Sequence, residues 1–214
     1  MAYRRTERVQ ARLADNRARI LEAARRLVAD GGFREVQIAS IASSAGVAVG
    51  SVYRYFPTKA ELFAEIVRSV SQREIDVLRE IADSGGPASE RLASAVRAFA
   101  SRALRGRRLA AAVLAEPVDA EVDNVRLEYR RIHCGTFERI ISEGIQAGEF
   151  PPQDVSAGAA CLVGAFLEGL ISPLALESTP DDDESERLID ALVRFALRAI
   201  SGREPAAGPL RLLA

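Results

Sequence analysis

The chain has 214 residues, of which 48% are hydrophobic and 28% charged, a balance that is typical of globular proteins and excludes a disordered chain. Residues 1–59 contain 11 basic and 5 acidic side chains, a net charge of +6, whereas residues 60–214 contain 18 basic and 25 acidic ones, a net charge of −7. This separation suits a protein of which only one end approaches a polyanion, although solvated charges also segregate by chance.

Apolar periodicity predicts helices along the whole chain and no strand-rich region. In residues 17–30 the apolar side chains lie on one helix face, and Gly31-Gly32 ends the helix. Pro57 ends another helix, and Thr58 can cap the next one. The helices expected from these patterns cover residues 17–30, 38–44, 49–55, 58–83, 88–104, 107–115, 119–147, 153–175 and 184–201.

The pattern therefore predicts an all-α protein of about nine helices. A small basic bundle of three helices, with a helix-turn-helix, comes first, and a larger acidic helical bundle follows. We expect a head of residues 1–59 with its basic arm, a body of residues 60–203, and a flexible tail of residues 204–214, which is rich in Pro and Gly.

Residues 38–63 form the most informative segment, with two short helices that meet at Gly46. Val52 and Phe56 lie four residues apart on the second helix and can bury against Ile20, Ile41 and Leu27. Tyr53, Arg54 and Tyr55 then remain for the surface, where hydroxyl and guanidinium donors suit phosphates and base edges.

The segment closely resembles the DNA-binding domain of the TetR (tetracycline-repressor) family. The resemblance runs from about Asn16 to Phe63. It is strongest at Ile41-Ala42, Ala45-Gly46-Val47, Gly50-Ser51, Val52-Tyr53-Arg54-Tyr55-Phe56 and Lys59. It implies a ligand-responsive transcriptional regulator, most simply a repressor, that binds palindromic operator DNA as a dimer and is released by a small organic effector.

The resemblance also implies which residues contact DNA. Val49, Gly50 and Ser51 would face bases and Tyr53 a base edge or phosphate, while Tyr55 and Lys59 would hold phosphates. The expected DNA-binding set is Gln37, Val49, Gly50, Ser51, Tyr53, Arg54, Tyr55 and Lys59.

Two positions depart from the family pattern. Gln37 stands where Thr or Ser usually caps the second helix, and it should cap more weakly. Ala48-Val49 replaces a Ser followed by a polar or basic residue, which favours contact of Val49 with a thymine methyl group.

The N-terminal arm is rich in arginine. Such arms in the family can add phosphate or minor-groove contacts, and a soluble tail is the alternative. The arginines in question are Arg4, Arg5, Arg8, Arg12, Arg17 and Arg19.

The last two long helices are apolar on more than one face, which requires burial on more than one face. In the resembling family, such helices from two subunits form a four-helix dimer bundle. Closing the core of a single chain is the alternative. The expected dimer contacts are Ala165, Gly169, Leu188, Leu192 and Phe195.

The effector pocket is harder to locate in the sequence. Aromatic residues with an arginine nearby would suit an amphipathic or anionic organic molecule, although each of them could equally belong to the core. His133, the only histidine, would more often be a hydrogen-bonded structural residue. The candidate lining is Phe99, Tyr129, His133, Phe137 and Phe166.

Other classes of protein fit less well. We find no nucleophile–base pair, phosphate-binding glycine loop or metal cluster, so we expect no enzyme, cofactor or metal.

Cys134 and Cys161 lack disulfide or zinc spacing, and the N-terminus has no signal-peptide core, which favours the cytoplasm. Residues 155–176 approach the length of a membrane span but contain Pro173 and lack flanking basic clusters, which favours a buried helix. Two alternative functions remain: an architectural DNA-binding protein without a sensor, and a scaffold with a vestigial head.

Overall fold

The computed structural model describes residues 2–175 and 181–202, and within these ranges the chain forms nine helices and no strand. The all-α prediction is confirmed, while the expected flexible tail, residues 204–214, lies outside the described part. The helices are α1 (Ala2–Glu35), α2 (Ile38–Ala45), α3 (Val49–Tyr55), α4 (Lys59–Asp83), α5 (Ala88–Arg105), α6 (Arg107–Ala115), α7 (Ala120–Gln146), α8 (Val155–Ala175) and α9 (Asp182–Ser201).

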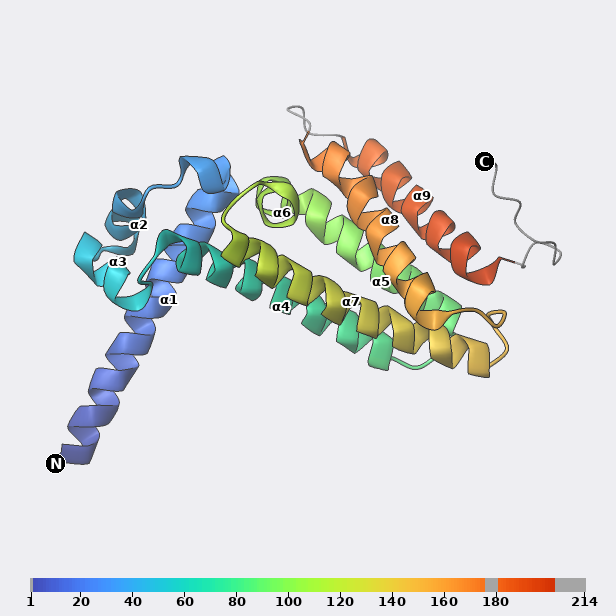
Figure 1. The fold of residues 1–214 in the computed structure, drawn as a ribbon, viewed down its shortest axis with the longest axis horizontal. Helices are drawn as coiled ribbons and strands as arrows, with labels where there is room; N and C mark the ends of the chain where they lie inside the picture. Colours follow the sequence, from blue (N-terminus) through green and yellow to red (C-terminus); the bar gives the residue numbers. More distant parts are fainter. Residues whose placement is uncertain (1, 176–180, 203–214) are drawn as a thin grey trace.

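The helices form an elongated molecule with the head at one end (Figure 1). Helices α1, α2 and α3 make up the head, from which the N-terminal part of α1 projects. Helices α4 and α7 run together along the body, and α8 and α9 lie on its other side, next to α5. Helix α6 sits where the head meets the body and contacts both α1 and α8.

Side-chain caps fix the starts of α4 and α9, among others. Thr58 Oγ1 accepts a hydrogen bond from the backbone N–H of Glu61 at 3.0 Å, which starts α4 at the predicted position. Asp181 and Glu184 form a capping box at the start of α9, where their side chains accept from each other's backbone N–H groups.

Helix α1 is much longer than its apolar pattern predicts. It begins at Ala2 rather than near residue 17, and it runs to a break at Gly32, where φ is 77° and ψ is 178°. Side chains 10–15 and 17–19 are all exposed, so this part of α1 has no apolar face for a periodicity analysis to detect. Its arginines and alanines nevertheless favour helix formation.

The buried side chains form two clusters, which we call the head core and the body core. Helix α4 contributes to both, with Leu62 to Ile75 in the head core and Leu78 and Ala82 in the body core. Val113 of α6 and Val122 of α7 also belong to the head core. The expected division at residues 59 and 60 therefore does not coincide with a gap in the packing.

Candidate DNA-binding and effector sites

The turn between α2 and α3 has the geometry that its glycine permits. Gly46 adopts a left-handed conformation with φ 65° and ψ 40°, and its N–H points to the carbonyls of Ala42 and Ser43. A side chain other than glycine is strained in this conformation. The turn redirects the chain so that α3 packs one face on α2 and turns the other outward.

Helix α3 is divided into a buried and an exposed face. Val52 and Phe56 are buried in the head core, as expected, whereas the side chains of Val49 and Tyr53 are 43% and 47% exposed. Arg54 is exposed as well. Tyr55 is half-buried against the head core, so the expectation of an outward tyrosine is met in full only at Tyr53.

The remaining expected DNA contacts lie around this exposed face. Gly50 is open, since an added Cβ would have no atom within 4 Å, and Ser51 is half-buried. Gln37 is exposed at the N-cap of α2 and makes no side-chain cap, in line with the weak cap expected there. Lys59 opens α4, with its Nζ 5.1 Å from the centre of the Phe63 ring.

Two arginines assigned to the arm bind partners on other helices of the protein, although both remain exposed to solvent. Arg17 forms an ion pair with Glu65 at 3.0 Å and lies over the Phe56 ring at 5.0 Å. Arg19 Nη2 donates to the carbonyl of Ala45 at 2.6 Å, at the C-terminal end of α2. These contacts hold α1 against α2 and α4, and they leave the two guanidinium groups less available for DNA than the sequence suggested.

A cavity of about 130 Å³ lies between α4, α5, α6 and α7. Phe99 and His133 line it, as does the ion pair between Arg102 and Glu74, whose atoms approach to 2.9 Å. A smaller space of about 30 Å³ shares part of this wall and adds Tyr129. Three of the five expected pocket residues are thus brought together around one space.

The other two expected pocket residues lie deeper. Phe137 and Phe166 are buried in the body core, where their ring centres are 5.6 Å apart, and neither lines the cavity. Phe166 also packs against Phe99, with ring centres 5.1 Å apart. They support the cavity wall from behind.

His133 is buried, with 9% of its surface exposed. Its Nδ1 lies 2.7 Å from the carbonyl oxygen of Tyr129, and its ring meets the Phe99 ring edge-on at 5.8 Å. Burial lowers the pKa of His133 below its ordinary value. Its other ring nitrogen, Nε2, is buried without a hydrogen-bond partner among the described residues.

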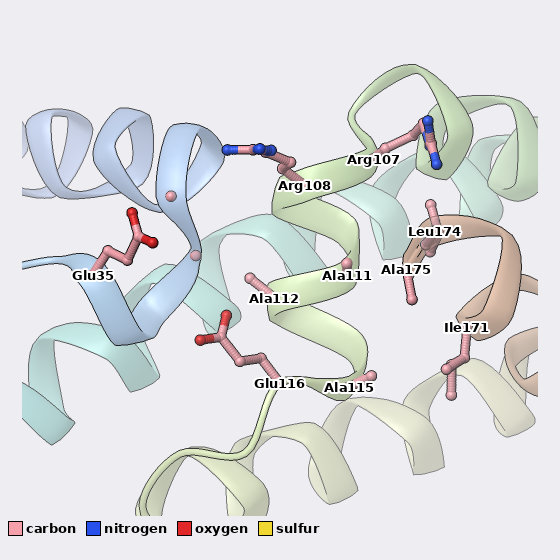
Figure 2. Close-up of a pocket in the computed structure, with 12 residues that line it drawn as sticks. Glu35, Arg107, Arg108, Ala111, Ala112, Ala115, Glu116, Ile171, Leu174 and Ala175 are labelled. Carbon is pink, nitrogen blue, oxygen red and sulfur yellow. The ribbon is translucent and has the colours of Figure 1, made fainter. Parts of the chain in front are cut away.

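Helix α6 ties the body to the end of α1 (Figure 2). The Glu116 carboxylate accepts hydrogen bonds from the backbone N–H groups of Phe33 and Arg34 at 2.8 and 2.9 Å. Arg108 donates to the carbonyl of Asp30. These contacts border an open cavity of about 530 Å³ between α1, α6 and the end of α8. No sequence motif marked Glu116, because its partners are backbone groups about eighty residues away.

Helices α8 and α9 present an exposed apolar surface. Phe195 is 52% exposed, and a Cβ added at Gly164 would meet no atom within 4 Å. In contrast, Leu192 is buried and packs on Gly169, so these two expected dimer contacts are used within the chain. Ala165 and Leu188 are half-buried. Helix α8 is long and apolar enough to cross a membrane by length and composition, and only 33% of its most apolar window is buried.

Two family models cover most of the chain. The model for bacterial regulatory proteins of the tetR family matches residues 20–66, which include α2, α3 and the start of α4. The model for the tetracyclin repressor-like C-terminal domain matches residues 85–168. This chain belongs to the TetR family. It is a transcriptional regulator of the ligand-responsive repressor type, with a helix-turn-helix head and a helical sensor body.

Named relatives of this TetR-family regulator control transcription. The repressor KstR of Mycolicibacterium smegmatis is 29% identical over 189 residues, which are 86% of this chain and 87% of KstR. The fatty acid metabolism regulator protein of Bacillus subtilis is 27% identical over 135 residues, 61% of this chain and 68% of that protein.

Solved structures share the fold of the TetR-family regulator. FadR from Bacillus subtilis in complex with stearoyl-CoA superimposes with a TM-score of 0.71 at 25% identity, over 87% of this chain and 98% of FadR. RolR in complex with resorcinol superimposes with a TM-score of 0.64 at 21% identity, over 93% of this chain and all of the RolR chain (100%), and shows likeness of fold alone.

Proposed function

We propose that this TetR-family regulator is a homodimeric repressor of the bacterial cytoplasm that binds palindromic operator DNA through α3 and leaves it when a small organic effector binds in the body. The observation that carries the proposal is the position of the effector cavity. Its walls include α4, α6 and α7, which are the helices of the body that contribute side chains to the head core.

The exposed face of α3 suits a major groove. Val49 and Tyr53 offer apolar and hydroxyl contacts, and Gly50 lets the backbone approach closely. Lys59 begins α4, where the positive end of the helix dipole also favours a phosphate. Gln37, Ser51, Arg54 and Tyr55 complete the proposed DNA surface.

Dimerisation explains the exposed apolar surface of α8 and α9. One helix-turn-helix reads one half-site, and two heads joined by a two-fold axis read a palindrome. The proposed contact centres on Phe195, with Ala165 and Leu188 at its edges and Gly169 and Leu192 beneath it. A four-helix contact of this kind also accounts for the low burial of α8 in the single chain.

An effector can act on the head by two routes. Ser71 and Glu74 on α4 line the cavity in the helix that begins with Lys59, and Leu114 on α6 lines it two residues before Glu116. A ligand that prefers the arrangement of α4 and α6 found away from DNA lowers operator affinity by its difference in affinity for the two arrangements. Stearoyl-CoA and resorcinol, bound by FadR and RolR, support a small organic effector and differ too much to name it.

DNA binding is tested with a duplex selected from a random library by the wild-type protein. Lys59→Ala should weaken binding to all sequences and reduce the slope of log affinity against log salt by about one per half-site. Arg79→Ala, an exposed cation further along α4, is the matched control and should leave the slope unchanged. Tyr53→Ala should cost about 1–3 kcal/mol per half-site with the fold intact. Equal slopes for Lys59→Ala and wild type contradict the proposed docking.

The dimer is tested by sedimentation equilibrium. Phe195→Glu should sediment as a monomer with unchanged helix content, because a carboxylate would be buried without a partner in the contact. Leu127→Glu, which alters a side chain 48% exposed on α7, should remain dimeric. A Phe195→Glu variant that stays dimeric at low concentration refutes the α8–α9 contact.

A further inference from the structure

The cavity between α4, α5, α6 and α7 is apolar over most of its wall but contains one unusual polar group. Phe99, Leu109, Val113 and Leu114 supply apolar surface, and His133 supplies the buried imidazole. A ligand site of this composition orients its occupant through few polar groups. The chemistry of His133 therefore indicates which kind of molecule fits.

The protonation of His133 follows from its hydrogen bond. A backbone carbonyl can only accept, so the Nδ1 atom that lies 2.7 Å from the carbonyl of Tyr129 carries the proton. Burial favours the neutral ring, and a neutral ring with a proton on Nδ1 has none on Nε2. Nε2 is therefore a bare hydrogen-bond acceptor.

This acceptor has no donor within the described residues. Nδ1 is turned back to the carbonyl of the preceding helical turn, so Nε2 lies at the outer end of the ring, away from the α7 backbone. His133 lines both the larger and the smaller space, together with Ser71. A buried acceptor without a partner is costly, and a molecule in the cavity that donates a hydrogen bond removes that cost.

The charges around the cavity favour an uncharged occupant. Arg102 is the cation on the larger wall, and its Nε donates to both Glu74 carboxylate oxygens at 3.0 and 2.9 Å. In the smaller space, Arg126 donates to the carbonyls of Val113 and Ala112 at 2.7 and 2.8 Å. Arg130 also lines that space, and its exposed side chain leaves it solvated. An anion would have to separate a formed ion pair or remain in water.

The volume limits the size of the occupant. The larger space measures about 130 Å³ and the adjoining one about 30 Å³. An apolar protein cavity of about 150 Å³ takes up benzene, whereas sites for drug-sized ligands measure about 300–1,000 Å³. The space therefore fits a single ring with a small substituent.

We propose that His133 anchors an effector site for a neutral, ring-sized molecule bearing a hydroxyl group, which donates its proton to Nε2 while the ring packs against Phe99. The proposal rests on the proposed function, since it names the effector class of that same cavity. The side chain of Ser71 also lines both spaces, and its hydroxyl is a second hydrogen-bonding partner for the hydroxyl group of the bound molecule.

The single histidine makes the test direct. Full-length protein labelled with ¹⁵N-histidine gives one pair of ring nitrogen resonances, and Nε2 should have the chemical shift of an unprotonated nitrogen. Phenol should move the Nε2 resonance in the direction of hydrogen-bond acceptance, whereas toluene, which has the same shape without a donor, should not. A protonated Nε2, or an Nε2 resonance that phenol leaves in place, overturns the proposal.

Binding of the same probes is measured by calorimetry. In His133→Phe the ratio of the phenol Kd to the toluene Kd should rise about tenfold, the effect expected for one lost hydrogen bond. His133→Gln retains an acceptor and should restore part of the preference, while Phe137→Leu, behind the cavity wall, should leave the ratio unchanged. Benzoate binding more tightly than phenol, or equal ratios in His133→Phe and wild type, refutes the assignment.

Operator binding is measured separately with the selected duplex. Phenol that occupies the His133 site without weakening operator binding contradicts the proposed release mechanism but leaves the site assignment intact. Release of the operator by phenol without any change at Nε2 contradicts the site assignment but leaves the repressor function intact.

Discussion

Replacement of Glu116 tests how firmly α6 holds the head. The carboxylate of Glu116 accepts from two consecutive backbone N–H groups, those of Phe33 and Arg34, directly after the helix break at Gly32. In Glu116→Gln the amide keeps one accepting oxygen, and its NH₂ group faces a second donor. One of the two hydrogen bonds is therefore lost, and the negative charge that strengthens both is removed.

The size of the effect follows from these contacts. A hydrogen bond to a charged group contributes about 1.5–3 kcal/mol, so Glu116→Gln should reduce the free energy of unfolding by about 2 kcal/mol. In a chain of this size, 1 kcal/mol corresponds to about 2–4 °C in Tm, so the variant should melt about 4–8 °C lower.

Two measurements check this expectation. Thermal unfolding followed by circular dichroism gives the loss of Tm, and amide hydrogen exchange should be faster at Phe33 and Arg34 than in the wild type. Glu128→Gln, an exposed glutamate on α7, makes the same charge change and should alter neither quantity. A Tm for Glu116→Gln equal to that of the control, with unchanged exchange at the two amides, would refute the reasoning.

Three further perturbations test other contacts. Gly32→Ala combines a φ of 77° with a Cβ placed 2.6 Å from a carboxylate oxygen, and calorimetry should show destabilisation by about 1–3 kcal/mol. Gly144→Ala places a Cβ 2.3 Å from the Phe150 ring and should lower Tm by about 6 °C, for about 2 kcal/mol of overpacking. Backbone N–H donors, that of Ser89 foremost, hold the pKa of Glu149 below its usual range. Stabilisation by this carboxylate is therefore complete above its unfolded pKa and is lost as the pH falls through the lower, folded one. The Tm advantage of wild type over Glu149→Gln should therefore shrink as the pH falls below the ordinary glutamate pKa of 4.5.

The sequence predicted the order and type of the helices because their apolar faces and end signals are local. Gly46, Pro57 and Thr58 each act within a few residues, and the structure places the turn, the end of α3 and the cap of α4 where those residues indicate. The start of α1 was missed for the complementary reason. Side chains 10–15 and 17–19 are all exposed, so no periodicity marked where the helix begins.

The burial of α3 could be predicted in part, since the spacing of Val52 and Phe56 shows which face is buried. The same spacing could not show that Tyr55 packs partly against the head core. It also could not show that Arg17 and Arg19 pair with other parts of the protein, because their partners, Glu65 and the Ala45 carbonyl, come from other helices. Long-range pairing of this kind is set by tertiary packing.

The sequence predicted the types of residue that line the cavity but not which residues reach it. Phe99, Tyr129 and His133 reach the space, while Phe137, equally aromatic and on the same helix as His133, points into the body core. Leu192 likewise turns inward onto Gly169. Composition identifies residues that need burial, and only the folded chain decides whether the burial is within one subunit or against a ligand or a second copy.

The passage of α4 through both hydrophobic clusters has a consequence for how the molecule melts. Residues 1–59 alone would lack Leu62, Ile66, Val113 and Val122, which enclose the head core from other segments. An excised head should therefore remain largely unstructured, and the intact protein should give one calorimetric transition rather than two. By the same reasoning, a helix-turn-helix from one such repressor cannot be joined to the sensor of another at residue 60 without mismatching the head-core side chains of α4, α6 and α7.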